Sequence, residues 1–335
     1  MPAISVLIPC FNGARTIQAL VRSVISDSAF ASGDEVIVVD DCSTDESASL
    51  AAGAGARVIT LERNGGPAIA RNRAVREAKN EIVFFLDSDT LLVPGSLSAV
   101  KAHFDRSNNA PIVNGLCSME PLRDGIGQRY KALVEFSWHA DMLERGQPPT
   151  IFNSRVGAMR RDIFLATGGL DERIRGAELE EHEFSYRLPK NATIKLDPRI
   201  VVRHDFPDIR KTLRVYFWRA AKWAELFTDY RRFDNSGAGG TSLGNGIGHL
   251  AGAAFPPLFV LGLLHQAFVV CGIGVLGAFI WIYRGLFRLA LRRGTVLAFE
   301  VLILHVVYSY AILCGVALGF LRVMFGRLHL KARGP

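Results

Sequence analysis

The sequence predicts an α/β protein with a mostly parallel, doubly wound sheet, followed by hydrophobic helices towards the C-terminus. Short apolar runs alternate with helical patterns over residues 1–110, and this alternation at a regular pitch is typical of a parallel sheet. The chain has 335 residues and a mean hydropathy of +0.21, but its apolar residues concentrate in residues 243–321, which are almost free of acids. Two structural parts are therefore expected.

Four short apolar runs are expected to form the parallel strands of the first part. They are Ile4–Ile8, Glu35–Val39, Arg57–Leu61 and Ile82–Leu86. Pro9 is expected to end the first of them, because proline has no N–H to donate to a neighbouring strand. Apolar residues at helical spacing predict a helix over Ile17–Ile25, and another helix contains Arg71. Further on, Pro111–Ser118 is expected to be a strand and Gly127–Glu144 a helix.

Polar residues follow three of the four predicted strands, at Pro9–Asn12, at Asp40–Asp41 and at Asp87 with Asp89. Ligands bind at the carboxyl ends of the strands in an open α/β sheet, so we expect these groups to converge on one edge. There is no G-x-G-x-x-G after the first strand and no G-x-x-x-x-G-K-[ST] anywhere. A dinucleotide oxidoreductase and a P-loop NTPase are therefore disfavoured.

Asp87 and Asp89, separated by one serine, form a D-x-D pair at the end of the fourth strand. Two carboxylates are costly to bury unless a positive charge lies between them, and a divalent cation carrying a diphosphate would supply that charge. The alternative is that Asp87 caps the next turn and Asp89 is solvated. Asp40 could accept from a base N–H or a ribose hydroxyl, and Arg71 could reach a base or a phosphate. Their alternatives are a simple cap and a surface cation.

The net charge of +7, with a pI of about 9.3, is common both to nucleic-acid-binding proteins and to proteins on anionic membranes. No basic-aromatic nucleic-acid motif is present, so a lipid bilayer is the expected partner and nucleic acid is not. The five cysteines form no C-x-x-C pair, which argues against a disulfide framework and a zinc site. The chain enters a strand at once, so no signal peptide is expected and the first part should stay in the cytosol.

Residues 207–234 form a basic helical pattern with Trp218 and Trp223, which favours an amphipathic helix on a membrane surface over an ordinary packed helix. A Gly/Ser/Asn linker follows at 235–246. Residues 247–322 are expected to hold two or three membrane-spanning helices, at about 247–264, 266–283 and 296–320, since one crossing takes about 20 residues. The tail at 323–335 is basic. An integral protein of the inner or plasma membrane is therefore expected, with a topology that the basic segments leave open.

Four segments in order, VLIPCFN, VIVVDDCSTD, NGGPAIARN and FFLDSDT, carry a more specific signal. Together they resemble the N-terminal half of family 2 glycosyltransferases, the inverting enzymes of GT-A (Rossmann-like) fold that use nucleotide-diphospho-sugars. The resemblance covers roughly residues 3–215, and the hydrophobic part resembles more loosely the anchors of membrane-bound, bacterial-type members. It implies a GT-A domain over 1–206, with a nucleotide-sugar half at 1–110 and an acceptor half at 111–206.

The resemblance also implies site residues for the nucleotide-sugar donor. They are Pro9, Asn12, Asp40, Asp41, Arg71, Asp87 and Asp89. A Mg²⁺ or Mn²⁺ cofactor would be held by Asp89 first and by Asp87, together with the substrate diphosphate. His204 is a further candidate ligand, as a histidine at this place is in some GT-A enzymes, although a lone histidine is more often structural.

The acceptor half contains Thr167–Glu172, which resembles the family's GGFDE turn. Counting back from Arg187-Leu188 places Glu180 and Glu181 on the family's Glu-Asp pair, so Glu181 falls on the general base. The chain has glutamate where aspartate is usual, so Glu180 remains the alternative base. Both acids could instead only favour the start of a helix. A phosphate acceptor would need no base.

The function that the resemblance implies is metal-dependent transfer of a sugar to a membrane-held lipid or polyprenyl-linked acceptor, in the synthesis of cell-envelope glycans. One alternative is a processive polysaccharide synthase, which two or three spans and the absence of Q-x-x-R-W disfavour. A second alternative is a non-catalytic scaffold that binds nucleotide or lipid, against which the intact D-x-D argues. The sequence does not identify the sugar, the nucleotide base or the acceptor.

Overall fold

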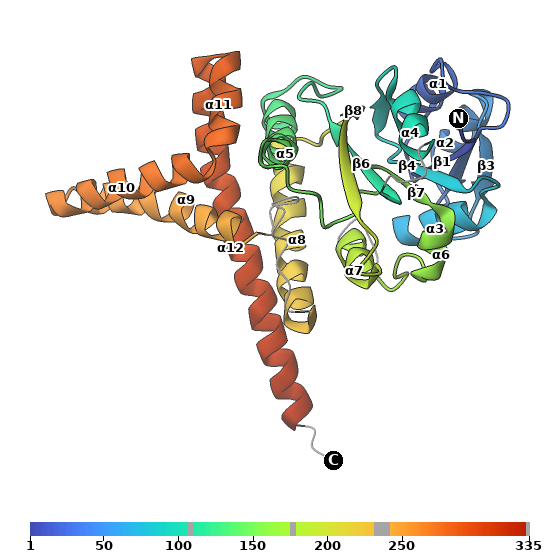
Figure 1. The fold of residues 1–335 in the computed structure, drawn as a ribbon. Helices are drawn as coiled ribbons and strands as arrows, with labels where there is room; N and C mark the ends of the chain where they lie inside the picture. Colours follow the sequence, from blue (N-terminus) through green and yellow to red (C-terminus); the bar gives the residue numbers. More distant parts are fainter. Residues whose placement is uncertain (106–109, 175–178, 231–241, 333–335) are drawn as a thin grey trace. The chain divides into compact units, whose positions relative to one another are not determined.

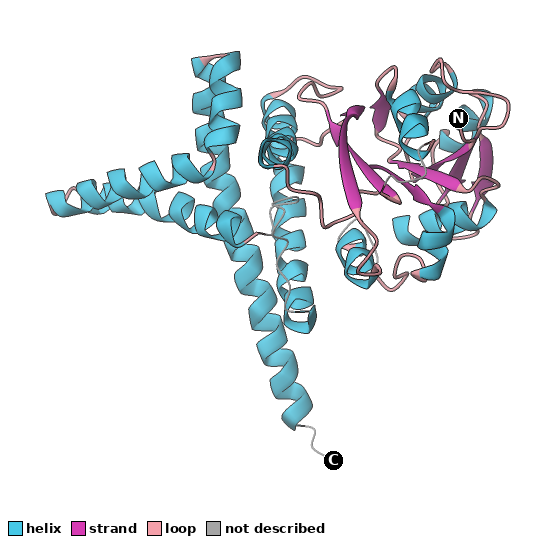
Figure 2. Ribbon diagram, viewed as in Figure 1, coloured by secondary structure: helices cyan, strands magenta, loops and turns pink. Residues whose placement is uncertain are grey.

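The computed structural model describes all of the chain except residues 106–109, 175–178, 231–241 and 333–335. The chain forms two compact units: Met1–Arg123 with Arg145–Asp205, and Asp124–Glu144 with Phe206–Pro335. The first unit contains the sheet and the second consists of helices (Figure 2). Most of the linker predicted at 235–246 lies outside the described residues.

The first unit is built on one eight-stranded sheet. Its strands are β1 (Ile4–Cys10), β2 (Glu35–Asp40), β3 (Arg57–Thr60), β4 (Ile82–Leu86), β5 (Thr90–Leu92), β6 (Ile112–Cys117), β7 (Val156–Arg160) and β8 (Ile194–His204). The order across the sheet is β3-β2-β1-β4-β7-β6-β8-β5. The predicted α/β class with a mostly parallel sheet is confirmed, and the predicted fourth strand matches β4 residue for residue.

The strands β3, β2, β1 and β4 are parallel, as their apolar runs predict. The order moves outward from β1 to β3 and then returns to β4 on the other side of β1. Right-handed crossovers then place helix α1 (Ile17–Ile25) and helix α3 (Pro67–Glu77) on opposite faces (Figure 1). Every residue of β1 and β4 is buried, because helices cover both faces.

The expectation that Pro9 ends the first strand is wrong, since β1 continues to Cys10. Pro9 pairs with Val39 of β2, whereas the pairing of β1 with β4 ends at Leu7. Beyond Leu7 the strand has a partner on one side only. The missing N–H of proline can therefore be accommodated there without breaking the ladder to β2.

The other half of the sheet mixes directions. Strand β7 runs antiparallel to both β4 and β6, and β8 runs parallel to β6 and antiparallel to β5. The short strand β5 follows the D-x-D pair directly and places Thr90 opposite His204. This pairing places His204, at the end of β8, next to the loop that follows β4 and carries Asp87 and Asp89. Two segments far apart in the sequence therefore meet here.

The remaining helices of the first unit are α2 (Ser47–Gly53), α4 (Ser96–Phe104), α6 (Arg161–Ala166) and α7 (Glu180–Arg187). Four phenylalanines join the sheet to α6 and α7 in a core cluster. Phe85 of β4 lies 5.5 Å, centroid to centroid, from both Phe152 and Phe164, and Phe164 lies 5.2 Å from Phe184. Aromatic pairs at these distances contribute beyond their buried area, so this cluster fixes α7 against the sheet.

The second unit contains α5 (Ile126–Arg145), α8 (Ile209–Tyr230), α9 (Leu243–Leu261), α10 (Gln266–Ile282), α11 (Arg284–Arg293) and α12 (Thr295–Ala332). Helix α5 is thus grouped with the hydrophobic helices rather than with the sheet. Its Tyr130 hydroxyl lies 2.8 Å from His305 Nδ1 on α12, and its Lys131 forms a buried ion pair of 2.8 Å with Glu135.

Helix α8, the basic helix of the sequence, runs alongside α12 (Figure 1). A Cβ added to Gly315 would lie 2.2 Å from the carbonyl oxygen of Phe217, and one on Gly319 would lie 2.1 Å from that of Ala221. Only glycine permits so close an approach of two backbones. One face of α8 is therefore packed on α12, while Trp218 remains exposed.

Among the described residues, one helical stretch, Thr295–Phe325 of α12, is long and apolar enough to cross a membrane. The count rises to two if α10 and α11, which meet at a bend of 81°, are taken as one broken span. The sequence led us to expect two or three spans, with a turn near His265. Helix α9 ends at Leu261 and α10 begins at Gln266, and between them His265 accepts a hydrogen bond from Ala267 N. The predicted span at 247–264 stays a prediction.

The glycine contact between α8 and α12 predicts opposite effects for one kind of substitution. Gly315→Ala with Gly319→Ala should lower the thermal unfolding temperature of the detergent-solubilised chain, because overpacking costs about 1–3 kcal/mol. The matched control is Gly274→Ala with Gly277→Ala on α10, where an added Cβ meets nothing within 4 Å. The control substitutions should raise the thermal unfolding temperature slightly, since alanine is more favourable in a helix than glycine by about 1 kcal/mol. Equal shifts for both pairs would refute the close packing.

Candidate active site

The two carboxylates of the D-x-D pair have different partners. Asp87 Oδ1 lies 2.6 Å from Arg71 Nη2, and its Oδ2 lies 3.5 Å from Arg155 Nε. Asp89 Oδ1 lies 3.2 Å from His204 Nε2. The turn after β4, in which Thr90 N and Oγ1 donate to Asp87 O, directs the two side chains to these separate neighbours. The pair is therefore neither a simple cap nor fully solvated.

Arg71 lies on α3 with only 4% of its side chain exposed. Its Nη1 donates to Glu180 Oε1 over 3.0 Å while its Nη2 binds Asp87. Burial alone would lower the pKa of Arg71, but the carboxylates of Asp87 and Glu180 outweigh it and raise that pKa, so the guanidinium stays charged. Sequence reasoning expected Arg71 to reach a base or a phosphate. In the structure both of its terminal nitrogens are engaged by carboxylates.

Asp89 and His204 meet because β5 pairs with β8, and Asp205 N donates to Asp89 O over 2.8 Å. Burial tends to raise the pKa of Asp89, but the charge and hydrogen bond of His204 outweigh it and lower that pKa to about 2. The carboxylate is therefore ionised at neutral pH. In the part of the chain that the structure describes, no group of three or more His, Cys, Asp or Glu residues could hold a metal. The carboxylate and the imidazole would suit Mg²⁺ or Mn²⁺ only if substrate phosphates complete the coordination.

The two acids at the end of β2 also differ. Asp41 accepts from Gly65 N over 2.7 Å and from Gly66 N over 2.8 Å, and so holds the turn that leads into α3. Asp40 accepts from Ser43 N through Oδ2, whereas its Oδ1 is buried with no hydrogen-bond partner among the described residues. A buried, unsatisfied carboxylate oxygen is costly, so it marks a place where a ligand can donate.

Asn12 connects the loops that follow β1 and β2. Its backbone has a positive φ of 51°, its N donates to Ser43 Oγ, and its Oδ1 accepts from Thr44 N over 2.9 Å. Pro9 lies within β1 next to this loop. The structure thus brings Pro9, Asn12 and both aspartates to one edge, as predicted, but uses the side chain of Asn12 to shape that edge.

Glu180 and Glu181 begin α7. Glu180 is 2% exposed and is held by Arg71. Glu181 Oε1 accepts from Ser154 Oγ over 2.6 Å and from Ser154 N over 3.0 Å. Ser154 precedes Arg155, which contacts Asp87, so the segment before β7 touches the acids of both halves of the site. Sequence reasoning did not identify Ser154 or Arg155, because no motif marks them.

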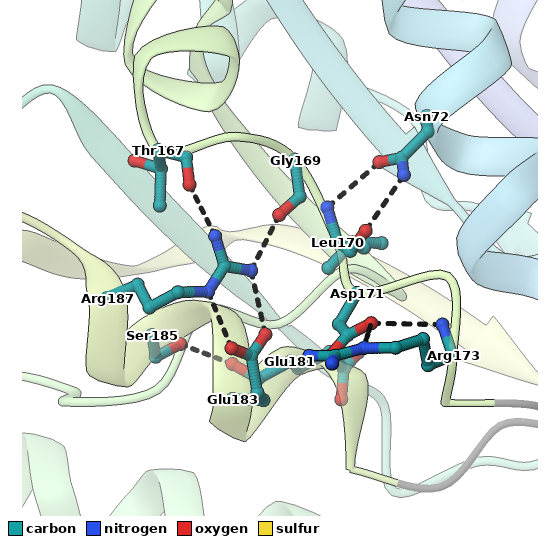
Figure 3. A network of polar contacts seen from close by, with 10 residues as sticks. All are labelled: Asn72, Thr167, Gly169, Leu170, Asp171, Arg173, Glu181, Glu183, Ser185 and Arg187. Carbon is teal, nitrogen blue, oxygen red and sulfur yellow. Dashed lines mark hydrogen bonds and ion pairs between the residues drawn. The ribbon is translucent and has the colours of Figure 1, made fainter.

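Figure 3 shows how α7 is held in position. Arg187 at the end of α7 donates to Gly169 O over 2.7 Å and to Thr167 O, and it pairs with Glu183 over 2.6 Å. Asn72 on α3 accepts from Leu170 N and donates to Leu170 O, both over 2.9 Å. The turn between these contacts is therefore clamped to α3 on one side and to α7 on the other.

Glycine is required in this turn. Gly168 and Gly169 have φ values of 87° and 71°, which other residues rarely adopt. A Cβ on Gly169 would also lie 2.7 Å from Asn72 Oδ1. These constraints explain the two adjacent glycines of the segment Thr167–Glu172. The segment's partner, the side-chain amide of Asn72, could not be predicted from the segment itself.

The amino-acid sequence is similar to a known protein family and to several characterised and uncharacterised proteins. Residues 5–166 match the family model described as glycosyl transferase family 2. An uncharacterized glycosyltransferase of Haemophilus influenzae is 26% identical over 198 residues, which cover 55% of this chain and 61% of that protein. The succinoglycan biosynthesis protein ExoU of Rhizobium meliloti is 37% identical over 99 residues, 28% of each protein. This chain therefore spans less than two thirds of the length of these relatives.

Among solved structures, a mannosyltransferase from Pyrobaculum calidifontis, in complex with GDP-Man and Mn²⁺, is similar to this chain. The similarity covers 97% of this chain and 88% of the other, with a TM-score of 0.55 and 17% sequence identity. At this identity the match shows that the two proteins share a fold.

The buried position of Arg71 predicts a large loss of stability when its charge is removed. Arg71→Met should destabilise the full chain by about 3–5 kcal/mol, because it leaves Asp87 and Glu180 without their buried cation. The thermal unfolding temperature should fall by roughly 10 °C. Arg73→Met on the same helix is the control, since the Arg73 side chain is 43% exposed and its one ion-pair partner among the described residues is Glu77. A surface pair contributes about 0–1 kcal/mol. Similar effects for the two variants would contradict the bridging role.

Proposed function

Because residues 5–166 match the family model of glycosyl transferase family 2, we propose that the chain is a metal-dependent, inverting glycosyltransferase of this family. It transfers a sugar from a nucleotide-diphospho-sugar to a membrane-held lipid or polyprenyl-linked acceptor. The observation that carries this proposal is the contact between Asp89 and His204 at the carboxyl edge of the sheet, beside the acids that begin α7. Similarity to the succinoglycan biosynthesis protein supports a role in the synthesis of cell-envelope glycans.

The nucleoside of the donor binds at the ends of β1 and β2. Asp40 Oδ1, buried and without a partner among the described residues, accepts a hydrogen bond from a base N–H or a ribose hydroxyl. Pro9 lines the same edge, and Asn12 and Asp41 keep the two loops in place through the bonds described above. Arg71 acts on the donor indirectly, by fixing Asp87.

The residues present fit a divalent metal. Asp89 and His204 would hold it as Mg²⁺ or Mn²⁺ together with substrate phosphates, and Asp87, already bound to Arg71 and Arg155, would contribute mainly charge. When bound, the metal neutralises the charge that grows on the departing diphosphate. Arg155 adds a positive charge on the same side, which also favours the leaving group.

Glu181 removes the proton of an acceptor hydroxyl. The acceptor oxygen attacks the anomeric carbon and forms the new C–O bond on the face opposite the bond that breaks to the diphosphate, so the configuration inverts. Ser154 fixes Glu181 Oε1, which orients this carboxylate. Glu180 is a poorer base because Arg71 engages its Oε1.

The second unit anchors the enzyme in the bilayer, with the first unit on the cytosolic side. Large apolar side chains are exposed on and between α9, α10 and α12, among them Leu263, Leu264, Val270, Trp281 and Val296. Such a surface is unfavourable in water and suits a hydrocarbon environment. Confining the enzyme to the membrane raises the effective concentration of a lipid-held acceptor.

Membranes containing the full chain, incubated with Mn²⁺ and a panel of radiolabelled nucleotide-sugars, should transfer label from one donor into material extracted by organic solvent. Asp89→Asn should abolish this transfer, because the metal loses its carboxylate ligand. Glu181→Gln should reduce it by about 10²–10⁴-fold, the usual contribution of a general base. Asp162→Asn, an exposed acid at the start of α6, is the control and should retain activity.

Each part of the proposal has its own contradicting outcome. Full transfer by Asp89→Asn would contradict the metal-dependent mechanism. Full transfer by Glu181→Gln would contradict the base assignment alone. Label found only in water-soluble product would rule out the lipid acceptor.

A further inference from the structure

Helices α9 and α10 form a hairpin whose sequence carries no acid and no lysine or arginine. The uncharged stretch runs from Leu243, where α9 begins, to Tyr283, directly after α10. The chain is then strongly basic at once, because α11 contains four arginines in ten residues and no acid. The charge of the second unit therefore changes abruptly at the open end of the hairpin.

The two helices of the hairpin support each other along their length. Near the turn, a Cβ added to Gly262 would lie 2.5 Å from Val269 Cγ2, and further along, one added to Gly252 would lie 2.6 Å from Phe279 Cε2. Phe255 and Phe279 lie 5.7 Å apart, centroid to centroid. Small residues that allow such close approach are typical of helix pairs in membranes. The helices thus lie side by side as one packed element (Figure 1).

The turn of the hairpin is both apolar and closed. Leu263 and Leu264 are 87% and 79% exposed. Four successive backbone N–H groups, from Gly262 to His265, donate to carbonyl oxygens of the last turn of α9. Unsatisfied backbone donors are what usually keep a turn out of hydrocarbon, where each of them is costly. This turn has satisfied those donors and presents leucines, so hydrocarbon suits it better than water does.

The side chain of His265 also contributes to closing the turn. Its Nδ1 accepts from Ala267 N over 3.1 Å, so this nitrogen carries no proton and caps α10. The bond satisfies one of the donors that the first turn of a helix leaves without an intrahelical partner. The other polar side chain of the turn, Gln266, is uncharged.

The open end of the hairpin has the side chains of a membrane interface. Trp281 is 69% exposed, and the guanidinium of Arg284 lies over its ring, 5.0 Å from the centroid. Arg288 and Arg292 follow at a spacing of four residues on the exposed face of α11, and Arg288 also lies 3.7 Å from Glu144. Tryptophan is enriched at the level of the lipid headgroups, and anionic headgroups attract such basic segments.

The angle between α10 and α11 decides which of them enters the bilayer. The two helices meet at 81°, so when one lies along the membrane normal the other lies along the surface. The uncharged α10 belongs in hydrocarbon and the arginine-bearing α11 at the surface, because charges in the bilayer core are costly. Helix α10 has 17 residues and is about 25 Å long, less than the core of about 30 Å. With its open end at the headgroups, the hairpin therefore ends inside the bilayer.

We propose that α9 and α10 form a re-entrant hairpin, which enters the bilayer from the side of α11 and returns to that side. Leu263 and Leu264 lie in the acyl-chain region, and the hairpin adds no crossing of the membrane. It replaces two of the spans expected from the sequence, at 247–264 and 266–283. The four arginines of α11 favour the cytosolic face for its open end. This inference rests on the membrane anchoring of the proposed function and adds the path of the chain.

Labelling of single cysteines in sealed membrane vesicles tests this path. Leu263→Cys at the turn is compared with Leu243→Cys at the start of α9, which is also an exposed leucine, and with Arg292→Cys on α11. A membrane-impermeant maleimide should label positions 243 and 292 in inverted vesicles only. It should label position 263 in neither orientation until detergent dissolves the membrane, which also shows that the thiol is reactive.

The native cysteines determine the background for these variants. Cys271 and Cys314 are exposed and Cys42 is half-buried, so these three are replaced by serine, whereas Cys10 and Cys117 are buried and stay. The same background without an added cysteine is the control and should remain unlabelled in both orientations.

A depth measurement gives a second readout. The fluorophore NBD is attached at position 263 or 243 in detergent, and the full chain is then placed in vesicles of phosphatidylcholine and phosphatidylglycerol. A nitroxide on the lipid acyl chain should quench NBD at position 263 more than a nitroxide on the headgroup does. The reverse order should hold at position 243.

Each alternative path has its own result. Label at position 263 in right-side-out vesicles would show that α9 and α10 are two complete spans. Label at this position in inverted vesicles, with stronger quenching by the headgroup nitroxide, would place the turn outside the core. Label at 243 and 292 from opposite sides would show that the chain crosses between them. Failure of the proposed anchoring would appear separately, as a chain absent from sedimented membranes, and failure of the proposed reaction as absence of sugar transfer.

Discussion

The site depends on one buried cation. The side chain of Arg71 is almost fully buried between Asp87, which follows β4, and Glu180, at the start of α7. Ionised groups out of water are stable only when they are paired, so the three elements that carry these residues must keep one arrangement. The nucleotide-sugar half and the acceptor half of the first unit are thereby joined at the point where sugar transfer is proposed.

This pairing separates the acids of the site into two kinds. The chain presents them in neighbouring pairs: Asp40 with Asp41, Asp87 with Asp89, and Glu180 with Glu181. In each pair one member holds the structure. Asp41 binds the Gly65-Gly66 turn, and Asp87 and Glu180 bind Arg71. Of the other members, Asp40 has a buried oxygen without a partner among the described residues, Asp89 is paired with His204, and Glu181 accepts from Ser154. A negative site can in this way be rigid before donor and metal bind.

Much of the first unit could be predicted from local patterns. The four parallel strands, the helix of Arg71 and the edge on which the acids meet follow from apolar runs and strand ends, which are local properties. The extension of β1 through Pro9, the antiparallel β7 and the partners of Arg71 depend on contacts between distant segments, which no local pattern encodes. Arg15, Arg123 and Asp205 are each separated by more than 80 residues in the sequence. They meet because Thr16 Oγ1 donates to Ser88 O and Leu122 N donates to His204 O. The grouping of α5 with the hydrophobic helices was likewise invisible, because its composition is that of an ordinary helix.

Binding of Mn²⁺, followed by the electron paramagnetic resonance signal of the free ion, tests the central claim most directly. The claim is that Asp89 and His204 hold a divalent metal together with a diphosphate. The full chain should quench the free Mn²⁺ signal in the presence of UDP or GDP and much less without a nucleotide. Asp89→Asn should weaken this nucleotide-dependent binding by at least about tenfold, on the scale seen when the support of a metal ligand is lost. Undiminished Mn²⁺ binding by Asp89→Asn would contradict the claim.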